Sequence, residues 1–396
     1  MIIATGIPGG YASEKGYLMK VVIAIDSFKG SLSTYEAGDA VAKAVRTVCP
    51  EAQITVSPLA DGGEGTAEAI ISSRGGTMQE IKVTGPLGER IDAAYGIILK
   101  TKTAIIEMAR AAGITLVPEE MRNPLNTTTY GVGEMIADAV SRGCRDFIVG
   151  IGGSATNDGG VGMLSALGFD FLDKDGAPIP MGARGLKDLA KIETRNALPE
   201  LSECSFSVAC DVKNPLCGDN GCSAVYGPQK GATADMIADM DAWLAYYAEL
   251  TKAIFPHSDA NFPGAGAAGG LGFAFLAYLG GTLRLCVELV IEATALEEKI
   301  KDADIVITGE GRLDGQSAMG KAPIGVARKA KKYGKLVIAF SGCVTEDATL
   351  CNEHGIDAFF PILRAPSSLE EAMNGETADK NLYSTAEQVM RLIKAN

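Results

Sequence analysis

Hydrophobic positions near the start of the chain follow the pattern of a strand, a helix and a second strand. Residues 21–26 (VVIAID) form a continuous apolar run, as expected for a parallel strand that is buried on both faces. The capping box at 33–36 (STYE) predicts a helix that extends to about residue 49. Residues 54–60 (ITVSPLA) predict the next strand, so the N-terminal region reads as a β-α-β unit.

The C-terminal region repeats this alternation. Apolar runs predict strands at 304–309, 335–342 and 358–363, with a helix over 321–334 that ends at a glycine. A last helix is expected from about Thr385 to Lys394. Alternating strands and helices of this kind predict a parallel sheet with right-handed crossovers.

The middle of the chain, from about Lys82 to Thr282, has a mixed pattern. It contains several strand-like segments, a hairpin-like segment around 173–176 and a long helix from Thr233 to about Phe255. The uncharged stretch 261–283 is interrupted by glycines and a proline, which predicts a Gly-rich turn and a short core helix and argues against a membrane span.

These patterns predict two α/β domains. Residues 19–81 and 283–396 would together form a Rossmann-like parallel-sheet domain, and residues 82–282 would form an inserted mixed α/β domain, with a cleft between the two. Residues 1–18 have neither the basic segment nor the long apolar run of a signal peptide, so we expect them to be a disordered extension.

Composition narrows the chemistry. A net charge of −13 over 396 residues argues against nucleic acid as a partner, and an anionic substrate would need local cations and backbone N–H groups. The nine cysteines form no CxxC pair, which predicts reduced thiols in a cytoplasmic protein without a membrane anchor. With only two histidines, acid–base chemistry would fall to a carboxylate.

Glycines and charged residues follow five of the predicted strands, where ligands bind in open α/β sheets. In chain order these candidate residues are Ser27 and Lys29; Asp61, Gly62 and Gly63; Gly152, Gly153, Ser154, Thr156, Asn157 and Asp158; Asp211 and Lys213; and Gly309, Glu310, Gly311, Arg312, Asp314 and Lys321. Phosphoryl transfer needs this mixture of N–H groups, cations and acids, whereas it needs no histidine or thiol.

Two further glycine motifs are incomplete. Residues 315–321 match G-x-x-x-x-G-K, but Ala322 replaces the hydroxyl residue of a P-loop. Residues 264–269 match GxGxxG, but no strand precedes them, so a dinucleotide site is not indicated. By contrast, the loop GGSATNDGG (152–160) follows a buried strand and precedes a helix, which favours an anion-binding loop. Its Asp158 has three open roles: a Mg²⁺ ligand, a helix cap, or a partner of substrate hydroxyls.

Six segments in order resemble the bacterial two-domain glycerate kinase family. They are DSFKGSLS, LADGGEGTAEAI, GIGGSATNDGG, CDVKNPLCG, PGAGAAGGLGF and TGEGRLDGQSAMGKAP, and the similarity extends from Met19 to the C-terminus. The resemblance implies phosphorylation of D-glycerate with ATP and Mg²⁺, giving 2-phosphoglycerate. It also implies a Rossmann-like domain built from both chain ends and an inserted α/β domain.

The roles of single residues are our own hypotheses. Lys29, Arg312 and Lys321 would bind the ATP phosphates or the glycerate carboxylate, because each lies beside a glycine at a strand end or a helix start. Asp211 or Asp61 would accept the hydroxyl proton or orient the acceptor. Glu310 and Asp314 would hold Mg²⁺. We therefore expect Asp211, Asp61, Lys29 and Arg312 to form the catalytic set.

Two other readings remain open at this stage. The protein could phosphorylate another small hydroxy acid, or it could be a non-catalytic two-domain protein that closes around a small molecule without ATP turnover. The sequence leaves open which hydroxyl is phosphorylated and which loop faces ATP. It is also compatible with a homo-oligomer.

Overall fold

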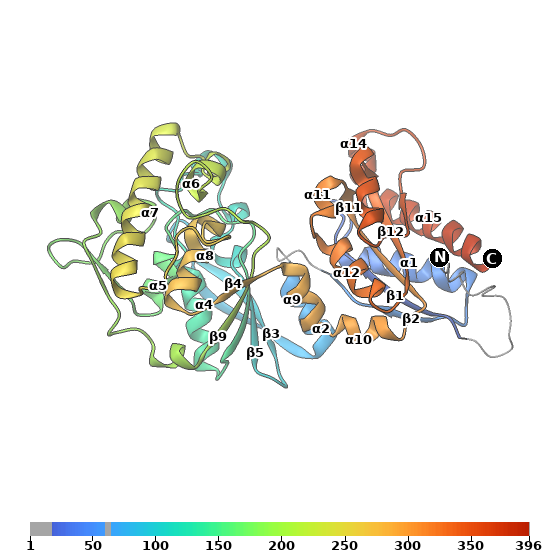
Figure 1. Ribbon diagram of the computed structural model, residues 1–396, viewed down its shortest axis with the longest axis horizontal. Coiled ribbons are helices and arrows are strands. Elements are labelled where there is room, and N and C mark those ends of the chain that lie inside the picture. Colours follow the sequence, from blue (N-terminus) through green and yellow to red (C-terminus); the bar gives the residue numbers. More distant parts are fainter. Residues whose placement is uncertain (1–17, 60–64, 396) are drawn as a thin grey trace, which may run out of the picture. The chain divides into compact units, whose positions relative to one another are not determined.

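The computed structural model describes residues 18–59 and 65–395, so Asp61, Gly62, Gly63 and most of the expected N-terminal extension lie outside the described residues. The chain divides into two compact units. Unit 1 combines Met1–Asp61 with Val290–Asn396, and unit 2 is Gly62–Leu289. Both are built from strands and helices, which confirms the predicted α/β class (Figure 1).

Unit 1 is built around a five-stranded sheet in the order β13-β12-β11-β1-β2. Every neighbouring pair in this sheet is parallel. Its strands are β1 (Lys20–Ile25), β2 (Gln53–Val56), β11 (Ile305–Leu313), β12 (Leu336–Val344) and β13 (Ala358–Pro361). β1 pairs directly with β11, so the two ends of the chain share one sheet (Figure 1). The sheet is thus the parallel, Rossmann-like one that the alternation predicted.

Helices cover the sheet of unit 1. α1 (Thr34–Val48) starts at the predicted capping box, in which Ser33 and Glu36 bond each other's backbone N–H groups. It packs beside α15 (Gly375–Ala395), and both share a core with alternate residues of β1, β11 and β12. α12 (Ala322–Lys331) contacts β11 and β12 but contributes nothing to that core. The last helix begins ten residues earlier than Thr385, because its polar first turns bury only a narrow apolar stripe.

Unit 2 contains a six-stranded mixed sheet in the order β10-β9-β6-β5-β4-β3. Its strands are β3 (Gly76–Thr84), β4 (Arg90–Ile98), β5 (Thr103–Glu107), β6 (Asp146–Gly150), β9 (Ser205–Ala209) and β10 (Thr282–Arg284). The expected domain boundaries, at 81/82 and 282/283, fall inside β3 and β10. β3 is partly or fully exposed along most of its length and buried only at its last two residues, and its antiparallel pairing with β4 assigns it to this sheet.

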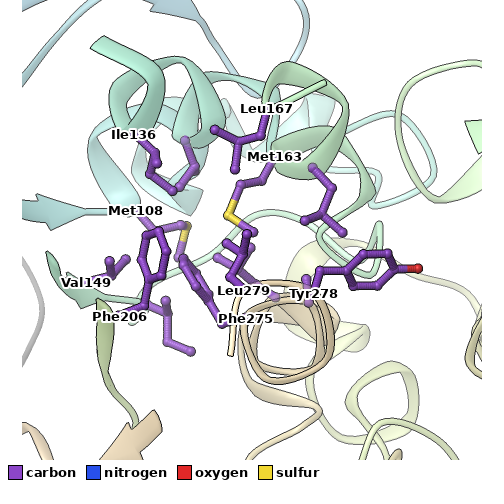
Figure 2. Packing of buried hydrophobic residues seen from close by; sticks show 14 of the residues in the cluster. Met108, Ile136, Val149, Met163, Leu167, Phe206, Phe275, Tyr278 and Leu279 are labelled. Carbon is purple, nitrogen blue, oxygen red and sulfur yellow. The ribbon is translucent and has the colours of Figure 1, made fainter. Parts of the chain in front are cut away.

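Large apolar side chains fill the core of unit 2 (Figure 2). Phe206 of β9 packs on Phe275 of α8 (Ala267–Tyr278), with ring centroids 5.6 Å apart. Other helices on this core include α4 (Tyr130–Ser141), α5 (Val161–Ala166) and the predicted long helix α7 (Ala234–Ile254). α8 accounts for the uncharged stretch, and no helix among the described residues is long and apolar enough to cross a membrane.

The remaining elements are short or peripheral. They are α2 (Thr66–Arg74), α3 (Ala109–Ala112), β7 (Asp170–Leu172), β8 (Lys191–Glu193), α6 (Cys222–Tyr226), α9 (Cys286–Ala293), α10 (Leu296–Lys301), α11 (Gly315–Ala318), α13 (Leu350–Glu353) and α14 (Leu369–Met373). Short 3-10 helices link several of them: η1 (Ile114–Leu116), η2 (Glu119–Met121), η3 (Ala183–Asp188), η4 (Pro199–Glu203), η5 (Pro228–Lys230) and η6 (Glu346–Thr349).

Candidate active site

In the sheet of unit 1, the direction in which successive strands are added reverses between β1 and β11. From β1 the chain continues to β2 on one side, whereas from β11 it continues to β12 on the other. Loops leaving such a pair of parallel strands diverge, and the crevice at their carboxyl ends is the usual ligand site of an open α/β sheet. Here the ends are in register: Ile25 lies opposite Gly309, and the Asp26 N–H donates to the Gly309 carbonyl at 2.9 Å.

The predicted residues of unit 1 gather at this point. Ser27 and Lys29 follow β1, while Gly309, Glu310, Gly311 and Arg312 form the end of β11, with Asp314 just beyond it. The Arg312 Nε lies 3.5 Å from the Asp314 carboxylate, and the Lys321 Nζ lies 3.7 Å from it. Both cations are loosely held and exposed at their ends, so they can turn toward a ligand.

β11 is longer than its apolar run predicts. The run ends at residue 309, but Glu310 and Arg312 still pair with Ser341 and Cys343 of β12. Pairing with β12 thus places Glu310 and Arg312 on a rigid strand. Gly311 lies beside the loop that follows β1, since a Cβ at this position would be 3.4 Å from the backbone nitrogen of Lys29.

Glu310 is the more buried carboxylate of this group. Burial raises its pKa, and the Ser317 hydrogen bond together with the positive charges of Lys321 and Lys29 opposes that rise. The Ser317 hydroxyl donates to Glu310 Oε1 at 2.5 Å. Glu310 is therefore held in one orientation beside three positive or hydrogen-bonding groups.

Asp314 has a structural contact of its own. It is the N-cap of α11 and accepts the Ser317 N–H at 3.0 Å. α11 occupies the first half of the G-x-x-x-x-G-K segment, so the segment does not have the geometry of a P-loop. Lys321 stands at the N-cap position of the ten-residue α12, where N–H groups and the helix dipole favour an anion.

In unit 2 the loop GGSATNDGG divides into an outer and an inner half. Gly152 and Gly153 are exposed, whereas Thr156, Asn157 and Asp158 are almost completely buried. The outer half is held from one side by α3 and the residues after it. The Ile114 N–H donates to the Gly153 carbonyl at 2.8 Å, and the Ala155 N–H donates to the Ala112 carbonyl at 2.9 Å.

Asp158 lies entirely in the inner half. Its oxygens accept the N–H and hydroxyl of Thr129 at 2.8 and 2.9 Å, and the N–H groups of Gly160 and Gly162 at 3.1 and 3.3 Å. Burial is the main influence on its pKa and raises it. These bonds tie Asp158 to the start of α5, whose N-cap is Gly160, and a ligand could reach this carboxylate only if the network opened. Its role toward a ligand stays a prediction.

Asp211 and Lys213 lie after β9, also in unit 2. Asp211 is exposed, and its Oδ1 accepts the Cys286 N–H at 2.9 Å, at the start of α9. Lys213 is exposed on the same loop. The geometry thus places an exposed carboxylate after β9, with one oxygen bonded to the start of α9, and its catalytic role stays a prediction.

Comparison with known proteins decides the family. The model of the glycerate kinase family matches residues 21–394. The chain belongs to the glycerate kinase family.

Several glycerate kinases match nearly the whole chain. Glycerate 2-kinase of Escherichia coli (strain K12) is 48% identical over 378 residues, which is 94% of this chain and 99% of that protein. Glycerate kinase of Bacillus subtilis (strain 168) is 45% identical over 376 residues, 95% of this chain and 98% of that protein. A solved structure of a candidate glycerate kinase 2 from Salmonella typhimurium LT2 superposes with a TM-score of 0.87 at 46% identity, covering 96% and 99% of the two chains. Membership of this kinase family implies ATP as co-substrate and a small-molecule acceptor.

A kinase site must accommodate a divalent metal. The described part of the chain contains no group of three or more His, Cys, Asp or Glu residues that could hold one. Mg²⁺, however, is usually held by one or two carboxylates together with substrate phosphates and water. Glu310 and Asp314 suit such a site, because both are carboxylates and both contact the Ser317 hydroxyl, which brings them close together.

Two buried carboxylates at strand ends are absent from the residues that the sequence predicts for the site. Asp26 is 6% exposed and follows β1 directly, with its Oδ1 accepting the Ser27 N–H at 2.7 Å. Its signal was an acid at the end of the apolar run VVIAID. We read it as part of the strand, although a carboxylate at the end of a buried strand in an α/β fold commonly faces the ligand site.

The second is Glu107, at the end of β5 in unit 2. Its carboxylate is 2% exposed; it accepts the Ala67 N–H at 2.8 Å and the Arg110 Nε–H at 2.9 Å. Arg110 also pairs with Glu68 at 2.6 Å. Burial raises the pKa of Glu107 against these bonds. The network ties the start of α2 to the end of β5, and its signal was the acid in IIEMAR.

Proposed function

We propose that this protein transfers the γ-phosphoryl group of ATP to a hydroxyl of D-glycerate and releases 2-phosphoglycerate. One observation carries the proposal: cations and carboxylates converge at the β1/β11 switch point of unit 1. Lys29, Arg312 and Lys321 meet Glu310 and Asp314 there, in a chain whose net charge is −13. A triphosphate that binds together with Mg²⁺ requires such a mixture of cations and carboxylates.

Lys29, Arg312 and Lys321 bind the phosphates of ATP in this proposal. The N-terminus of α12 adds N–H groups that point at the same anion. Glu310 and Asp314 hold Mg²⁺, which neutralises charge on the transferred phosphoryl group when it is bound. Ser317 keeps Glu310 in place through its 2.5 Å hydrogen bond. Ser27, Gly309 and Gly311 bring the backbone of the two strand ends close to the ligand.

D-Glycerate offers a carboxylate and two hydroxyls to be recognised. We assign the outer part of the unit 2 loop, the exposed Gly152 and Gly153 with the adjoining buried Ser154, to one of the anionic groups. Lys213, two residues after Asp211, is assigned to the acceptor side. Asp211 accepts the hydroxyl proton or orients the acceptor, and Asp61, with Gly62 and Gly63, is the alternative. A carboxylate suits this task because phosphoryl transfer needs the acceptor positioned more than it needs a strong base.

A cytoplasmic location is part of the same proposal. All nine cysteines are free thiols, which is typical of reducing compartments. A homo-oligomer stays a prediction.

The test is direct. The purified protein is incubated with ATP, Mg²⁺ and D-glycerate, and the phosphoglycerate isomer is identified by phosphorus NMR. We expect 2-phosphoglycerate and stoichiometric ADP. L-Glycerate, lactate, tartronate and sugar acids are assayed in parallel. Faster ADP release with one of these would replace glycerate as the substrate, 3-phosphoglycerate would overturn the assigned hydroxyl, and ligand binding without ADP release would favour a non-catalytic binding protein.

A further inference from the structure

Lys230 is a lysine in the interior of unit 2. It ends the 3-10 turn η5 (Pro228–Lys230) and is 2% exposed. Its Nζ donates to the carbonyl of Thr156 at 2.6 Å. Burial lowers the pKa of Lys230 to about 8, and Asp158 is one of the groups that oppose this. A buried ammonium is costly, so a protein that keeps one at this depth needs a reason for it.

The carbonyl that Lys230 binds belongs to the inner half of the GGSATNDGG loop. The backbone of α8 encloses that carbonyl: Gly269 lies so close that a Cβ there would be 2.1 Å from the Thr156 oxygen. No described backbone N–H donates to this oxygen, and the Lys230 ammonium supplies the hydrogen bond. Lys230 therefore satisfies an acceptor that no element of regular structure reaches.

A second side chain acts on the inner half from a neighbouring element. Asn157 Nδ2 donates to the Ser223 hydroxyl of α6 at 2.9 Å. Two other buried atoms of this segment, Thr156 Oγ1 and Asn157 Oδ1, have no hydrogen-bond partner among the described residues. Stability alone would not select an unsatisfied polar core held by a buried charge, and such local conflicts are typical of functional segments.

The inner half is continuous with the outer half, in which Gly152 and Gly153 are exposed and Ser154 is buried. Only Ala155 separates Thr156 from Ser154, and Ala155 is pinned to Ala112 from the other side. The loop is therefore held by α3 and Ile114 at its outer half and by Lys230 at its inner half. A movement of the Thr156 carbonyl changes the direction of the peptide groups at Gly153 and Ser154, and misplacement by about 1 Å is enough to weaken a positioned contact.

We propose that Lys230 is a positioning residue: from the interior it fixes the Gly152–Ser154 edge for an anionic group of ATP or of D-glycerate. The inference rests on the proposed function for the identity of those ligands. It predicts that the loss of the ammonium acts on the binding of one substrate and leaves the chemical step in place.

The experiment compares three variants with the wild type. Lys230→Met removes the charge and keeps the side-chain length, and Ser223→Ala removes the partner of Asn157. Lys187→Met is the matched control, because Lys187 is exposed on η3 (Ala183–Asp188) of the same unit. KM for ATP, KM for D-glycerate and kcat are measured for each, with Kd values from calorimetry. We expect KM and Kd of one substrate to rise about tenfold in Lys230→Met and about threefold in Ser223→Ala, with kcat within about twofold. The control should match the wild type.

Several results would overturn the inference. They are both KM values within about twofold of wild type, both raised equally, or a loss of kcat alone. If Lys230→Met does not fold, Ser223→Ala decides alone, since a serine-to-alanine change leaves the volume of the core nearly intact. A wild type that does not phosphorylate D-glycerate would refute the proposed function; the Kd comparison would then test Lys230 separately, and unchanged or absent binding would refute the inference.

Discussion

At the scale of single residues, the charged groups of this protein fall into two kinds. Arg312 and Lys321 stand at a strand end and a helix start with their ends in solvent, whereas Asp158 and Lys230 are enclosed by donors or acceptors of their own unit. The first kind can meet a ligand directly. The second kind can act on a ligand only by holding the backbone that does.

Removing the exposed cations should reduce catalysis without unfolding the protein. We expect Lys29→Ala and Arg312→Ala each to lower kcat/KM by about 10- to 100-fold, because each removes a charge that stabilises the transferred phosphoryl group. Steady-state kinetics with ATP and D-glycerate measure the effect. Arg328→Ala, on the exposed side of α12, is the control and should change nothing. Values within about threefold of wild type for both variants would contradict their role.

The pH dependence of stability should identify the buried lysine. Its folded pKa, about 8, lies below the ordinary value, so the unfolded chain binds more protons between these two values and stability due to this group rises with pH. We therefore expect Lys230→Met to lose about 2 kcal/mol relative to wild type between about pH 7 and about pH 10. Urea unfolding of both proteins at each pH measures the difference. A difference that is constant with pH would mean that Lys230 titrates normally.

At the scale of elements, short segments with unusual backbone decide where the loops lie. α8 begins with three residues in the left-handed region, Ala268, Gly269 and Gly270, and this turn lies directly on the GGSATNDGG loop. α5 begins after its N-cap Gly160, and Asp158 accepts the N–H groups of Gly160 and Gly162 there. These contacts act together with the glycines of the loop, of which Gly153, Gly159 and Gly160 have positive φ.

Adding a methyl group to Gly269 should be far more costly than adding one to a comparable glycine. Gly269 and Gly280 both have positive φ, +68° and +60°, so alanine is strained at either position. Only at Gly269 would the Cβ meet backbone, at 2.1 Å from the Thr156 oxygen. We expect Gly269→Ala to destabilise unit 2 by at least about 3 kcal/mol and Gly280→Ala by about 1 kcal/mol in urea unfolding. Equal losses would show that the loop yields without cost.

Asp158→Asn tests the hydrogen bonds that hold the start of α5. Four donors converge on the two carboxylate oxygens, and an amide would turn its own N–H₂ toward some of them. We expect a loss of about 2–4 kcal/mol in the free energy of unfolding. Asp188→Asn, an exposed aspartate of the same unit, should lie within about 0.5 kcal/mol of wild type. A stable but inactive Asp158→Asn protein would instead favour direct contact with substrate.

At the scale of the whole molecule, the two units differ in how the chain builds them. Unit 2 is continuous from Gly62 to Leu289 and has its own large core. Unit 1 needs both ends of the chain, because β1 lies between β11 and β2 in its sheet. Without β1, the buried edges of β11 and β2 have no partner.

Fragments of the chain should reflect this difference. We expect residues 62–289, produced alone, to unfold cooperatively in urea as monitored by circular dichroism. Residues 290–396 alone should lack a cooperative transition and regain one when residues 18–61 are added in trans. A cooperative 290–396 fragment would show that the C-terminal strands do not depend on β1.

The strands of unit 1 were predictable, because a strand that is buried on both faces has a continuous run of apolar residues in the sequence. The polar end of β11 was not, because Glu310 and Arg312 extend it only through pairing with β12. Asp26 was missed for a similar reason, because it directly continues an apolar run. The sequence also did not assign β3 to the sheet of unit 2, because its pairing with β4 leaves no local pattern. The candidate residues at the strand ends came from composition and topology together, and their assignment to ligands still depends on the experiments above.

The sequence by itself determined the α/β class, the shared sheet of the two chain ends, and the family, because burial periodicity, turn chemistry and ordered motifs are local properties. Only the tertiary structure decided which polar groups of GGSATNDGG face outward. Gly152 and Asp158 belong to one short loop, yet the partners that separate them, Thr129, Lys230 and Gly269, lie 29 or more residues away from the groups that they contact. The direction in which a loop side chain points depends on neighbours distant in sequence, and the folded chain alone brings them together.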